Sequence, residues 1–194
     1  MEVNTMNKQP EQTAKTRAAI IQAFLEIASE KGISGVTVAS CMKRCGYNRG
    51  TFYEYFTDVE DMISQIEAEI IDDLRGSISS LGSDFIDMDF QSAAAHAAKF
   101  LSSYDDRIFV LISSKGDPAF LQKIEELICG FLQNIFDFPE DPEIRIYLVR
   151  GYTASLIRAV TCWKADNKPF PVERLSKQLQ EIWFSDKHLT VQTM

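Results

Sequence analysis

The sequence predicts an all-α protein of about nine helices, and three observations lead to this fold class. Apolar residues recur along the chain with the spacing of a buried helix face. No stretch of useful length alternates apolar and polar residues as a half-buried strand does. Pro118, Pro142 and Pro171 each stand where the first turn of a helix tolerates proline. The 194 residues are enough to bury a substantial core.

The N-terminal region is predicted to begin with a polar, flexible arm over residues 1–12. An apolar face over residues 20–28 then predicts a helix that ends at Gly32, because glycine is common at helix C-caps. Thr37 is a natural N-cap, and it predicts a second helix over about 38–44.

Two more caps follow at short intervals. Gly46 is expected to end the second helix, and Asn48 to cap a third over about 49–55. Asp58 is expected to cap a fourth helix, whose apolar face continues to about residue 81. The remaining helices are predicted over residues 90–103, 105–114, 118–136, 142–165 and 171–184.

Charge is distributed unevenly between two predicted domains, over residues 1–57 and 58–194. The net charge of −8 argues, as an average, against a nucleic-acid partner. Residues 1–57 nevertheless hold seven basic and five acidic side chains, whereas 58–194 hold 13 and 23. A phosphate-binding surface needs local positive charge, so the asymmetry predicts two parts with different partners.

The segment CGYNRGTFYEYF, residues 45–56, predicts a helix that reads DNA. Two short helices joined by a glycine-containing turn form a helix-turn-helix, whose second helix lies in the major groove. On a helical wheel Phe52 and Phe56 fall together and face the core. The opposite arc and its borders carry Arg49, Gly50, Thr51, Tyr53, Glu54 and Tyr55. A guanidinium can read guanine, and hydroxyl groups can donate to phosphate.

This region resembles the tetracycline-repressor-like (TetR/AcrR) family of bacterial transcription regulators. The resemblance is carried by TRAAIIQAFLEIASEKGISGVTV and CGYNRGTFYEYFTDVEDM, within about residues 16–62. It implies a ligand-responsive repressor that binds a palindromic DNA operator as a homodimer. It implies that Arg49 is the main residue that reads the nucleobases. The other predicted DNA-binding residues, including nearby basic side chains, are Thr51, Tyr53, Tyr55, Thr37, Gly50, Asn48, Lys43, Arg44 and Arg17.

Three positions depart from the family pattern. Val59 stands where lysine is common at the start of the fourth helix, so one phosphate contact is expected to be missing. Tyr47 replaces a small aliphatic residue and Cys45 replaces alanine, and we interpret both as core substitutions.

A dimer interface is predicted near the C-terminus. Small residues spaced by four in the helix from Pro142 allow another helix to approach closely, and two helices from each subunit would form a four-helix bundle. The predicted interface comprises Leu148, Gly151, Ser155, Ala159, Cys162, Leu175, Leu179, Ile182 and Trp183. The alternative is that these faces pack within one subunit.

The resemblance also implies a pocket for a small effector, enclosed by the helices from Asp58 to Phe136, and we expect it to be apolar with a few polar groups. The alanines of SAAAHAAKFLSSY leave space on one helix face. The candidate lining residues are His96, Tyr104, Phe109, Phe120, Phe131 and Tyr152. The alternative is that the alanines allow tight packing, with His96 exposed or hydrogen-bonded within the protein.

Other classes of function have less support in the sequence. The chain has no evident nucleophile–base pair or glycine-rich phosphate loop, so we expect no enzyme and no cofactor. Four cysteines without a CxxC pair and only two histidines predict no metal site. With no secretory signal and no membrane-spanning apolar run, we expect a cytoplasmic protein without a membrane partner. The main alternative is a helical protein–protein adaptor whose helix-turn-helix is degenerate.

Overall fold

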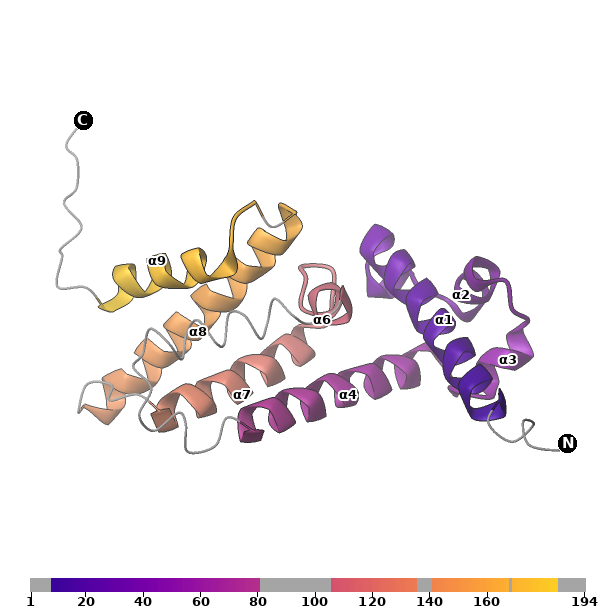
Figure 1. Cartoon of the computed structure of the whole chain (residues 1–194), viewed down its shortest axis with the longest axis horizontal. Helices are drawn as coiled ribbons and strands as arrows, with labels where there is room; N and C mark the ends of the chain where they lie inside the picture. The colour runs from indigo at the N-terminus through magenta and orange to yellow at the C-terminus, as the bar shows by residue number, and fades with distance from the viewer. Residues whose placement is uncertain (1–7, 81–105, 136–140, 168, 185–194) are drawn as a thin grey trace, which may run out of the picture. The chain divides into compact units, whose positions relative to one another are not determined.

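The computed structural model describes residues 8–80, 106–135, 141–167 and 169–184 (Figure 1). Those residues contain eight α-helices, one short 3₁₀-helix and no strand. The elements are α1 (Lys8–Lys31), η1 (Ile33–Gly35), α2 (Val38–Cys45), α3 (Arg49–Tyr53), α4 (Val59–Ser80), α6 (Asp106–Leu111), α7 (Pro118–Ile135), α8 (Pro142–Ala165) and α9 (Val172–Phe184). The all-α prediction is confirmed, while the helix expected over 90–103 lies outside the described residues.

The first helix begins earlier than predicted. We expected an arm over residues 1–12, but α1 starts at Lys8. Pro10 lies within the first turn, where its missing N–H costs no helical hydrogen bond. Glu11 and Lys15 pair one turn apart, with 2.7 Å between Oε1 and Nζ, which adds a small stabilisation to the exposed helix.

Capping residues set the boundaries of α2 and α3 as predicted. Thr37 and Ser40 form a capping box at the start of α2. Gly46 then adopts the left-handed conformation, with φ of 78°, and ends α2. Asn48 caps α3, because its side-chain oxygen accepts a hydrogen bond from the Thr51 N–H at 3.0 Å. Helix α3 ends at Tyr53, two residues before the predicted end.

Helix α4 also begins at its predicted cap. The Asp58 carboxylate accepts a hydrogen bond from the Asp61 N–H at 2.7 Å. Helix α6 ends at Leu111, three residues before the predicted end, because the chain turns back there: Asp117 N–H donates to the Leu111 carbonyl at 2.8 Å. Only glycine fits at Gly116 in this turn, since a Cβ there would lie 1.9 Å from that carbonyl oxygen.

The chain divides into two compact units, each with its own core. The first unit comprises Met1–Leu74 and Asp106–Leu121, and the second comprises Arg75–Asp105 and Gln122–Met194. The first unit thus extends beyond the expected boundary at residue 57, because α4 carries core residues of this unit as far as Leu74. The division at residue 57 remains a prediction about function.

The core of the first unit forms under the helix-turn-helix. Helix α1 packs against α2, η1 and α6, and α2 packs against α3. The side chains that are almost completely buried include Ile20, Phe24, Cys41, Met42, Phe52, Phe56, Met62, Ile66 and Ile70. Apolar burial on this scale stabilises the unit, at about 25 cal/mol per Å² removed from water. Helix α3, only five residues long, is therefore held by its neighbours and not by its own helix propensity.

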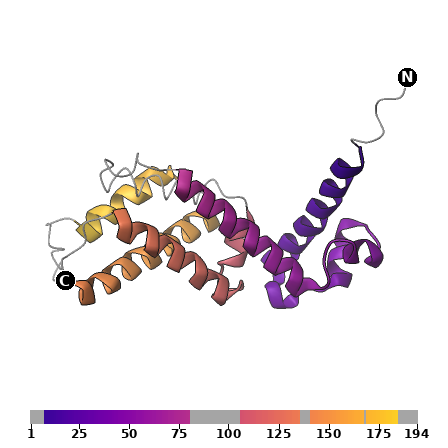
Figure 2. The same ribbon diagram turned by 90° about the horizontal axis from the view of Figure 1, so that it is seen from below.

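In the second unit α8 packs against α9, and the two helices lie side by side in Figures 1 and 2. The indole of Trp163 donates a hydrogen bond to the Phe170 carbonyl at 2.7 Å, which fixes the turn between these helices. Helices α7 and α8 are joined through a buried contact of 3.2 Å between Cys129 Sγ and Thr153 Oγ1. No helix in the described ranges is long and apolar enough to cross a membrane.

Candidate nucleic-acid interface

The aromatic residues of α3 divide between the core and the surface. Phe52 and Phe56 are 0% and 2% exposed, and their ring centroids lie 5.4 Å apart. Tyr53, one residue after Phe52, is 58% exposed. The helical wheel drawn from the sequence is therefore confirmed for the buried pair, which anchors α3 and leaves its other face to solvent.

The exposed face of α3 carries the side chains that the sequence predicted there. Arg49, Gly50 and Glu54 are exposed, and Thr51 and Tyr55 are half-buried. Gly50 also lies close to its own cap, since a Cβ there would be 3.0 Å from Asn48 Oδ1. The exposed face of α3 therefore has no side chain at Gly50, and a guanidinium and hydroxyl groups surround that position.

Two basic side chains near α3 are available to a ligand. Lys43 and Arg49 are exposed, and neither has a hydrogen-bond or ion-pair partner among the residues that the structure describes. The predicted contact at Thr37 is less open, because its hydroxyl accepts from the Ser40 N–H at 3.1 Å and lies 3.1 Å from Ser40 Oγ. Thr37 is thus first of all a helix cap.

Arg44 is held within the protein. Its Nη1 and Nη2 donate to the two carboxylate oxygens of Glu30 at 2.9 and 3.0 Å, and Nη1 lies 3.4 Å from Glu26. The hydrogen bonds from this guanidinium hold the pKa of Glu30 below its usual value. A phosphate would have to compete with two carboxylates for Arg44, whereas Arg49 has no such competitor among the described residues.

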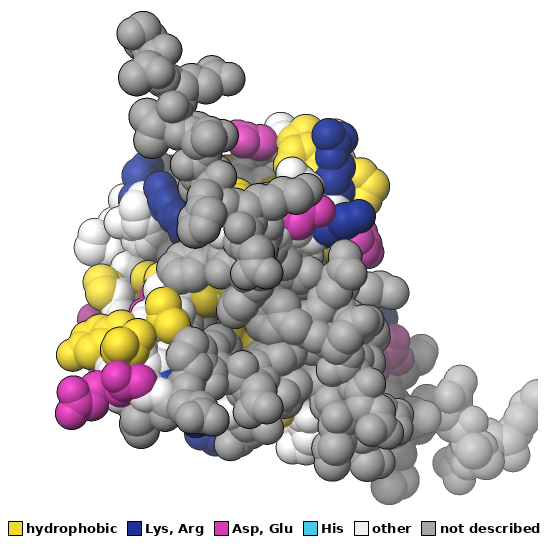
Figure 3. All heavy atoms as spheres, turned by 90° about the vertical axis from the view of Figure 1, so that its left-hand side faces the viewer, with side chains coloured by type: hydrophobic (Ala, Val, Ile, Leu, Met, Phe, Trp, Pro, Cys, Tyr) yellow, Lys and Arg dark blue, Asp and Glu magenta, His cyan; other side chains and the backbone are white. Residues whose placement is uncertain are grey.

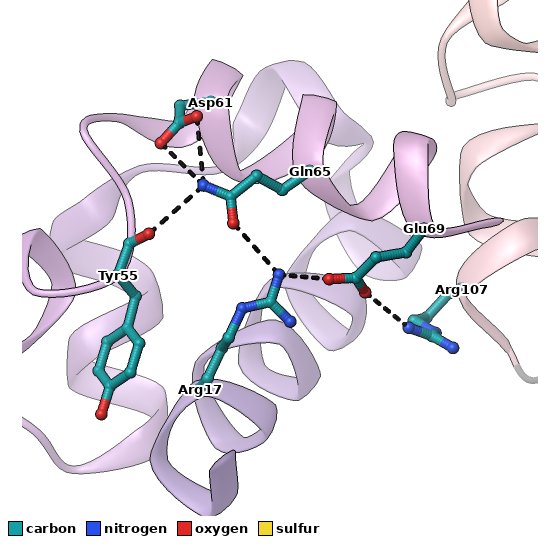
Figure 4. Close-up of polar contacts among 6 residues, drawn as sticks. All are labelled: Arg17, Tyr55, Asp61, Gln65, Glu69 and Arg107. Carbon is teal, nitrogen blue, oxygen red and sulfur yellow. Dashed lines mark hydrogen bonds and ion pairs between the residues drawn. The ribbon is translucent and has the colours of Figure 1, made fainter. Parts of the chain in front are cut away.

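Arg17, also predicted to contact DNA, points into a polar cluster instead (Figure 4). Its Nη2 donates to Glu69 Oε1 at 2.6 Å and to Gln65 Oε1 at 3.2 Å. Its guanidinium carbon lies 5.3 Å from the centroid of the Phe56 ring. Arg17 therefore connects α1 to α4 and to the end of the recognition segment, a structural role that the sequence analysis did not foresee.

The same cluster fixes the backbone beyond α3. Gln65 Nε2 donates to the Tyr55 carbonyl at 3.4 Å and to the two oxygens of Asp61 at 3.2 and 3.3 Å. Asp61 also accepts from the Thr57 N–H at 2.8 Å, and this backbone hydrogen bond lowers the pKa of its carboxyl. The side chain of Tyr55 points away from the cluster in Figure 4, which leaves its hydroxyl free to face a ligand.

The interpretation of Tyr47 as a core residue is wrong. Its side chain is 38% exposed in the turn between α2 and α3. The places in the core beneath α3 are taken by Phe52 and Phe56, which are buried. Cys45 is half-buried, with Sγ 3.7 Å from the Met42 carbonyl, so it lies at the edge of the core.

The predicted effector-pocket residues are divided between the two units. Phe109 (half-buried) and Phe120 (buried) belong to the first unit, whereas Phe131 (half-buried) and Tyr152 (buried) belong to the second. His96 and Tyr104 lie outside the described residues. A separate hollow of about 390 Å³ in the second unit is lined by Gln122, Glu125, Glu126, Cys129, Gln133, Ile146, Arg150 and Ala154. None of the six predicted residues lines it, and the charged side chains of Glu125, Glu126 and Arg150 in its lining distinguish it from the apolar pocket that the sequence predicted.

The predicted dimer residues lie on a face of α8 and α9 that is incompletely covered. Leu148, Gly151, Ser155 and Ala159 are half-buried, and Cys162 is exposed. On α9, Leu175 and Leu179 are half-buried, Ile182 is 61% exposed, and the side chain of Trp183 is outside the described set.

Two further apolar residues, which were not among the predicted interface residues, extend this face. Ile144 and Tyr147 in the first turns of α8 are 52% and 74% exposed. At 100° per residue, both fall on the arc of Gly151, opposite the buried Val149 and Leu156. The same wheel, extended by two turns toward the N-terminus of α8, would have found them. Figure 3 shows a face of the molecule where exposed hydrophobic side chains lie beside acidic and basic ones.

A short helix that is anchored by two phenylalanines and presents an arginine and hydroxyl groups to solvent defines a helix-turn-helix protein. Residues 20–66 match the family model "Bacterial regulatory proteins, tetR family". The chain is 32% identical over 73 residues to the uncharacterized HTH-type transcriptional regulator YvdT of Bacillus subtilis (strain 168). That match covers 36% of this chain and 38% of the relative's length.

Solved structures resemble most of the chain. A TetR transcriptional regulator from Streptococcus agalactiae 2603V is 25% identical, with a TM-score of 0.62 over 93% of this chain and 99% of that one. NalD of Pseudomonas aeruginosa, the secondary repressor of the MexAB-OprM multidrug efflux pump, is 18% identical, with a TM-score of 0.63 over 90% and 96%. FadR from Bacillus subtilis, solved with stearoyl-CoA, is 18% identical, with a TM-score of 0.57 over 88% and 99%. At 18% identity, the last two show a shared fold alone.

Residues 20–66 therefore resemble the DNA-binding domain of the TetR family of bacterial regulatory proteins. The relatives named above are described as transcriptional regulators or repressors.

Proposed function

We propose that this protein is a transcriptional regulator that binds a specific DNA sequence through α3. The observation that carries the proposal is the exposed Arg49, which has no hydrogen-bond or ion-pair partner among the described residues. It stands at the start of a helix whose opposite side is anchored by Phe52 and Phe56. The first residues of a recognition helix are those that contact base edges in the major groove. A guanidinium there can donate two hydrogen bonds to one guanine.

Around Arg49, we assign the other exposed groups to the sugar–phosphate backbone. Thr51, Tyr53 and Tyr55 carry hydroxyl groups on or beside the open face of α3, and Lys43 supplies a charge from the end of α2. Contacts of this kind fix the position of a protein on the duplex and carry no sequence information. We do not assign Arg44 and Arg17 to DNA, because each is already paired with a carboxylate.

We propose that the regulator acts as a homodimer. One recognition helix reads only half a site, and a symmetric pair of helices reads two half-sites that are about 34 Å or a multiple apart. The exposed apolar face of α8, from Ile144 and Tyr147 to Cys162, supports a second copy as the partner. Small residues at Gly151, Ser155 and Ala159 would allow the two α8 helices to approach closely.

Regulation by a small apolar ligand is part of the proposal, and repression is its expected direction. NalD is described as a repressor, and FadR was solved with an acyl-CoA, so this fold supports both properties in other proteins. A ligand would act by favouring a state whose two recognition helices no longer match the operator. The adaptor alternative is not favoured, because it gives no account of an exposed arginine on α3 that has no partner in the part of the chain that the structure describes.

The experiment that tests the proposal compares two arginines five residues apart in the same motif. Arg49→Ala should lose about 1–3 kcal/mol of specific binding and relax the sequence preference at one position. Arg44→Ala is the matched control, because it removes the same charge from an arginine that is paired with Glu30. Equal effects of the two substitutions on sequence preference would contradict the assignment of Arg49 as the base reader.

A further inference from the structure

Tyr47 is exposed at a position where the sequence predicted a core residue. In the first unit, the large apolar side chains that are well exposed are Tyr47 (38%) and Tyr53 (58%), among the residues that the structure describes. They stand at the two ends of α3, one residue before its Asn48 cap and at its last residue. Leaving this much aromatic surface in water forgoes stabilisation that burial would provide.

The conformation of the turn fixes where Tyr47 lies. Gly46 is left-handed, with φ of 78° and ψ of 15°, and Asn48 is extended and caps α3. These two residues hold the turn on both sides of Tyr47. Within the described part of the chain, the Tyr47 side chain has no hydrogen-bond partner and no ring contact.

Few basic side chains near this turn are available to bind phosphate. Arg44 on one side is paired with Glu30 and Glu26, and Val59 gives α4 no cation at its start. Lys43 and Arg49 are the nearby cations without a partner among the described residues. Neutral donors must therefore supply a larger share of the contacts to phosphate, and a tyrosine hydroxyl is one of the side-chain groups that do so.

We propose that Tyr47 is a DNA-contact residue, whose hydroxyl donates a hydrogen bond to a backbone phosphate beside the base read by Arg49. The inference rests on the proposed function, since it needs α3 in the major groove. Tyr47 immediately precedes the N-cap of the recognition helix. A residue at that position lies at the edge of the major groove, where the sugar–phosphate chain runs. The contact would strengthen binding without adding sequence preference.

The test uses the full-length protein and an operator selected with the unaltered protein. Tyr47→Phe removes only the hydroxyl and keeps the ring, so folding should be unchanged and the melting temperature serves as a check. We expect about a tenfold loss of operator affinity, from one hydrogen bond to a charged acceptor, and the same base preference at every position. Because the lost donor is neutral, the dependence of affinity on salt concentration should stay the same.

Lys43→Gln is the matched control for a charged contact in the same surface. It should lower affinity and also make the salt dependence shallower, by about one unit of slope per subunit. The contrast between the two variants separates a neutral phosphate contact from a general change in the surface.

The outcomes separate the inference from the proposed function. Loss of affinity with unchanged salt slope and base preference supports the phosphate contact. If Tyr47→Phe binds the operator as tightly as the unaltered protein, the inference is overturned and the proposed function stands. A change of base preference at one position would also overturn it, in favour of a contact to a base. If the unaltered protein selects no operator, the proposed function fails and the inference fails with it.

Discussion

Arg17 on α1 donates to Glu69 on α4 at 2.6 Å, although the two residues are 52 positions apart in the sequence. Glu69 uses its other oxygen to accept from Arg107 on α6 at 3.3 Å, so one carboxylate joins three helices of the first unit (Figure 4). All three side chains are partly shielded from water, with 26–40% of their surface exposed.

We expect Glu69→Gln to lower the free energy of unfolding by about 1 kcal/mol, because two guanidinium groups lose their shared counter-charge. Urea denaturation measures the change. Glu11→Gln is the control, because it removes a carboxylate from an exposed pair with Lys15 on α1, which should cost about 0.3–0.5 kcal/mol or less. Equal changes in the two variants would mean that the shared position of Glu69 adds nothing.

The same substitution at two glycines should have opposite effects. Gly46→Ala should destabilise the protein by about 1 kcal/mol, because the backbone there is left-handed, although no described atom lies within 4 Å of the new Cβ. Gly76→Ala, in the regular helix α4 with equally open space, should stabilise it by about 0.5–1 kcal/mol. Thermal unfolding of both variants checks the signs, and stabilisation at Gly46 would contradict the turn described here.

Stability should fall in acid through Asp61, whose pKa is held below its usual value near 3.9 by the Thr57 N–H. A carboxyl whose pKa is lower in the folded state stabilises the protein above its unfolded pKa, and this stabilisation is lost as the pH falls through the folded value. Asp61→Asn should therefore be less stable than the unaltered protein near pH 7, and the difference should shrink as the pH falls through the folded pKa of Asp61, which lies below its usual value. Chemical denaturation across that range is the measurement, and a difference that does not change with pH would exclude this role of the charge.

A charge on the exposed face of α8 should separate the proposed dimer. Tyr147, which is 74% exposed, would lie against the second copy, so Tyr147→Glu would bury a carboxylate in an apolar interface. We expect sedimentation equilibrium to show a shift from dimer to monomer. Ala119→Glu, at an exposed site on α7 in the first unit, adds the same charge and should leave the assembly unchanged. A Tyr147 variant that remains a dimer would place the interface elsewhere.

Local features of this protein could be predicted from the sequence, and features that depend on distant contacts could not. Thr37, Asn48 and Asp58 cap their helices as predicted, because a cap needs only its own turn. The buried positions of Phe52 and Phe56 follow from helical spacing in the same way.

Local spacing in the sequence could not predict the roles of Arg17, Arg44 and Tyr47. The partners of Arg17 are on another helix, 48 and 52 residues away, and those of Arg44 are 14 and 18 away, so no spacing rule connects them. Whether an aromatic residue in a turn is buried depends on what already fills the core, and Phe52 of α3 and Phe56 just after it fill the core here. A predicted DNA contact can thus become a structural ion pair, and a predicted core residue can become a surface one.

The most direct measurement of the central claim is selection of bound sequences from random duplex DNA by the purified protein, at two salt concentrations. We predict a palindromic motif whose half-sites are about one helical turn or a little more apart, with one position that loses its preference in Arg49→Ala. Binding to that motif should weaken as salt increases, since part of it comes from counterion release. Enrichment of no sequence, with the same weak binding by the protein and the Arg49 variant, would contradict the account.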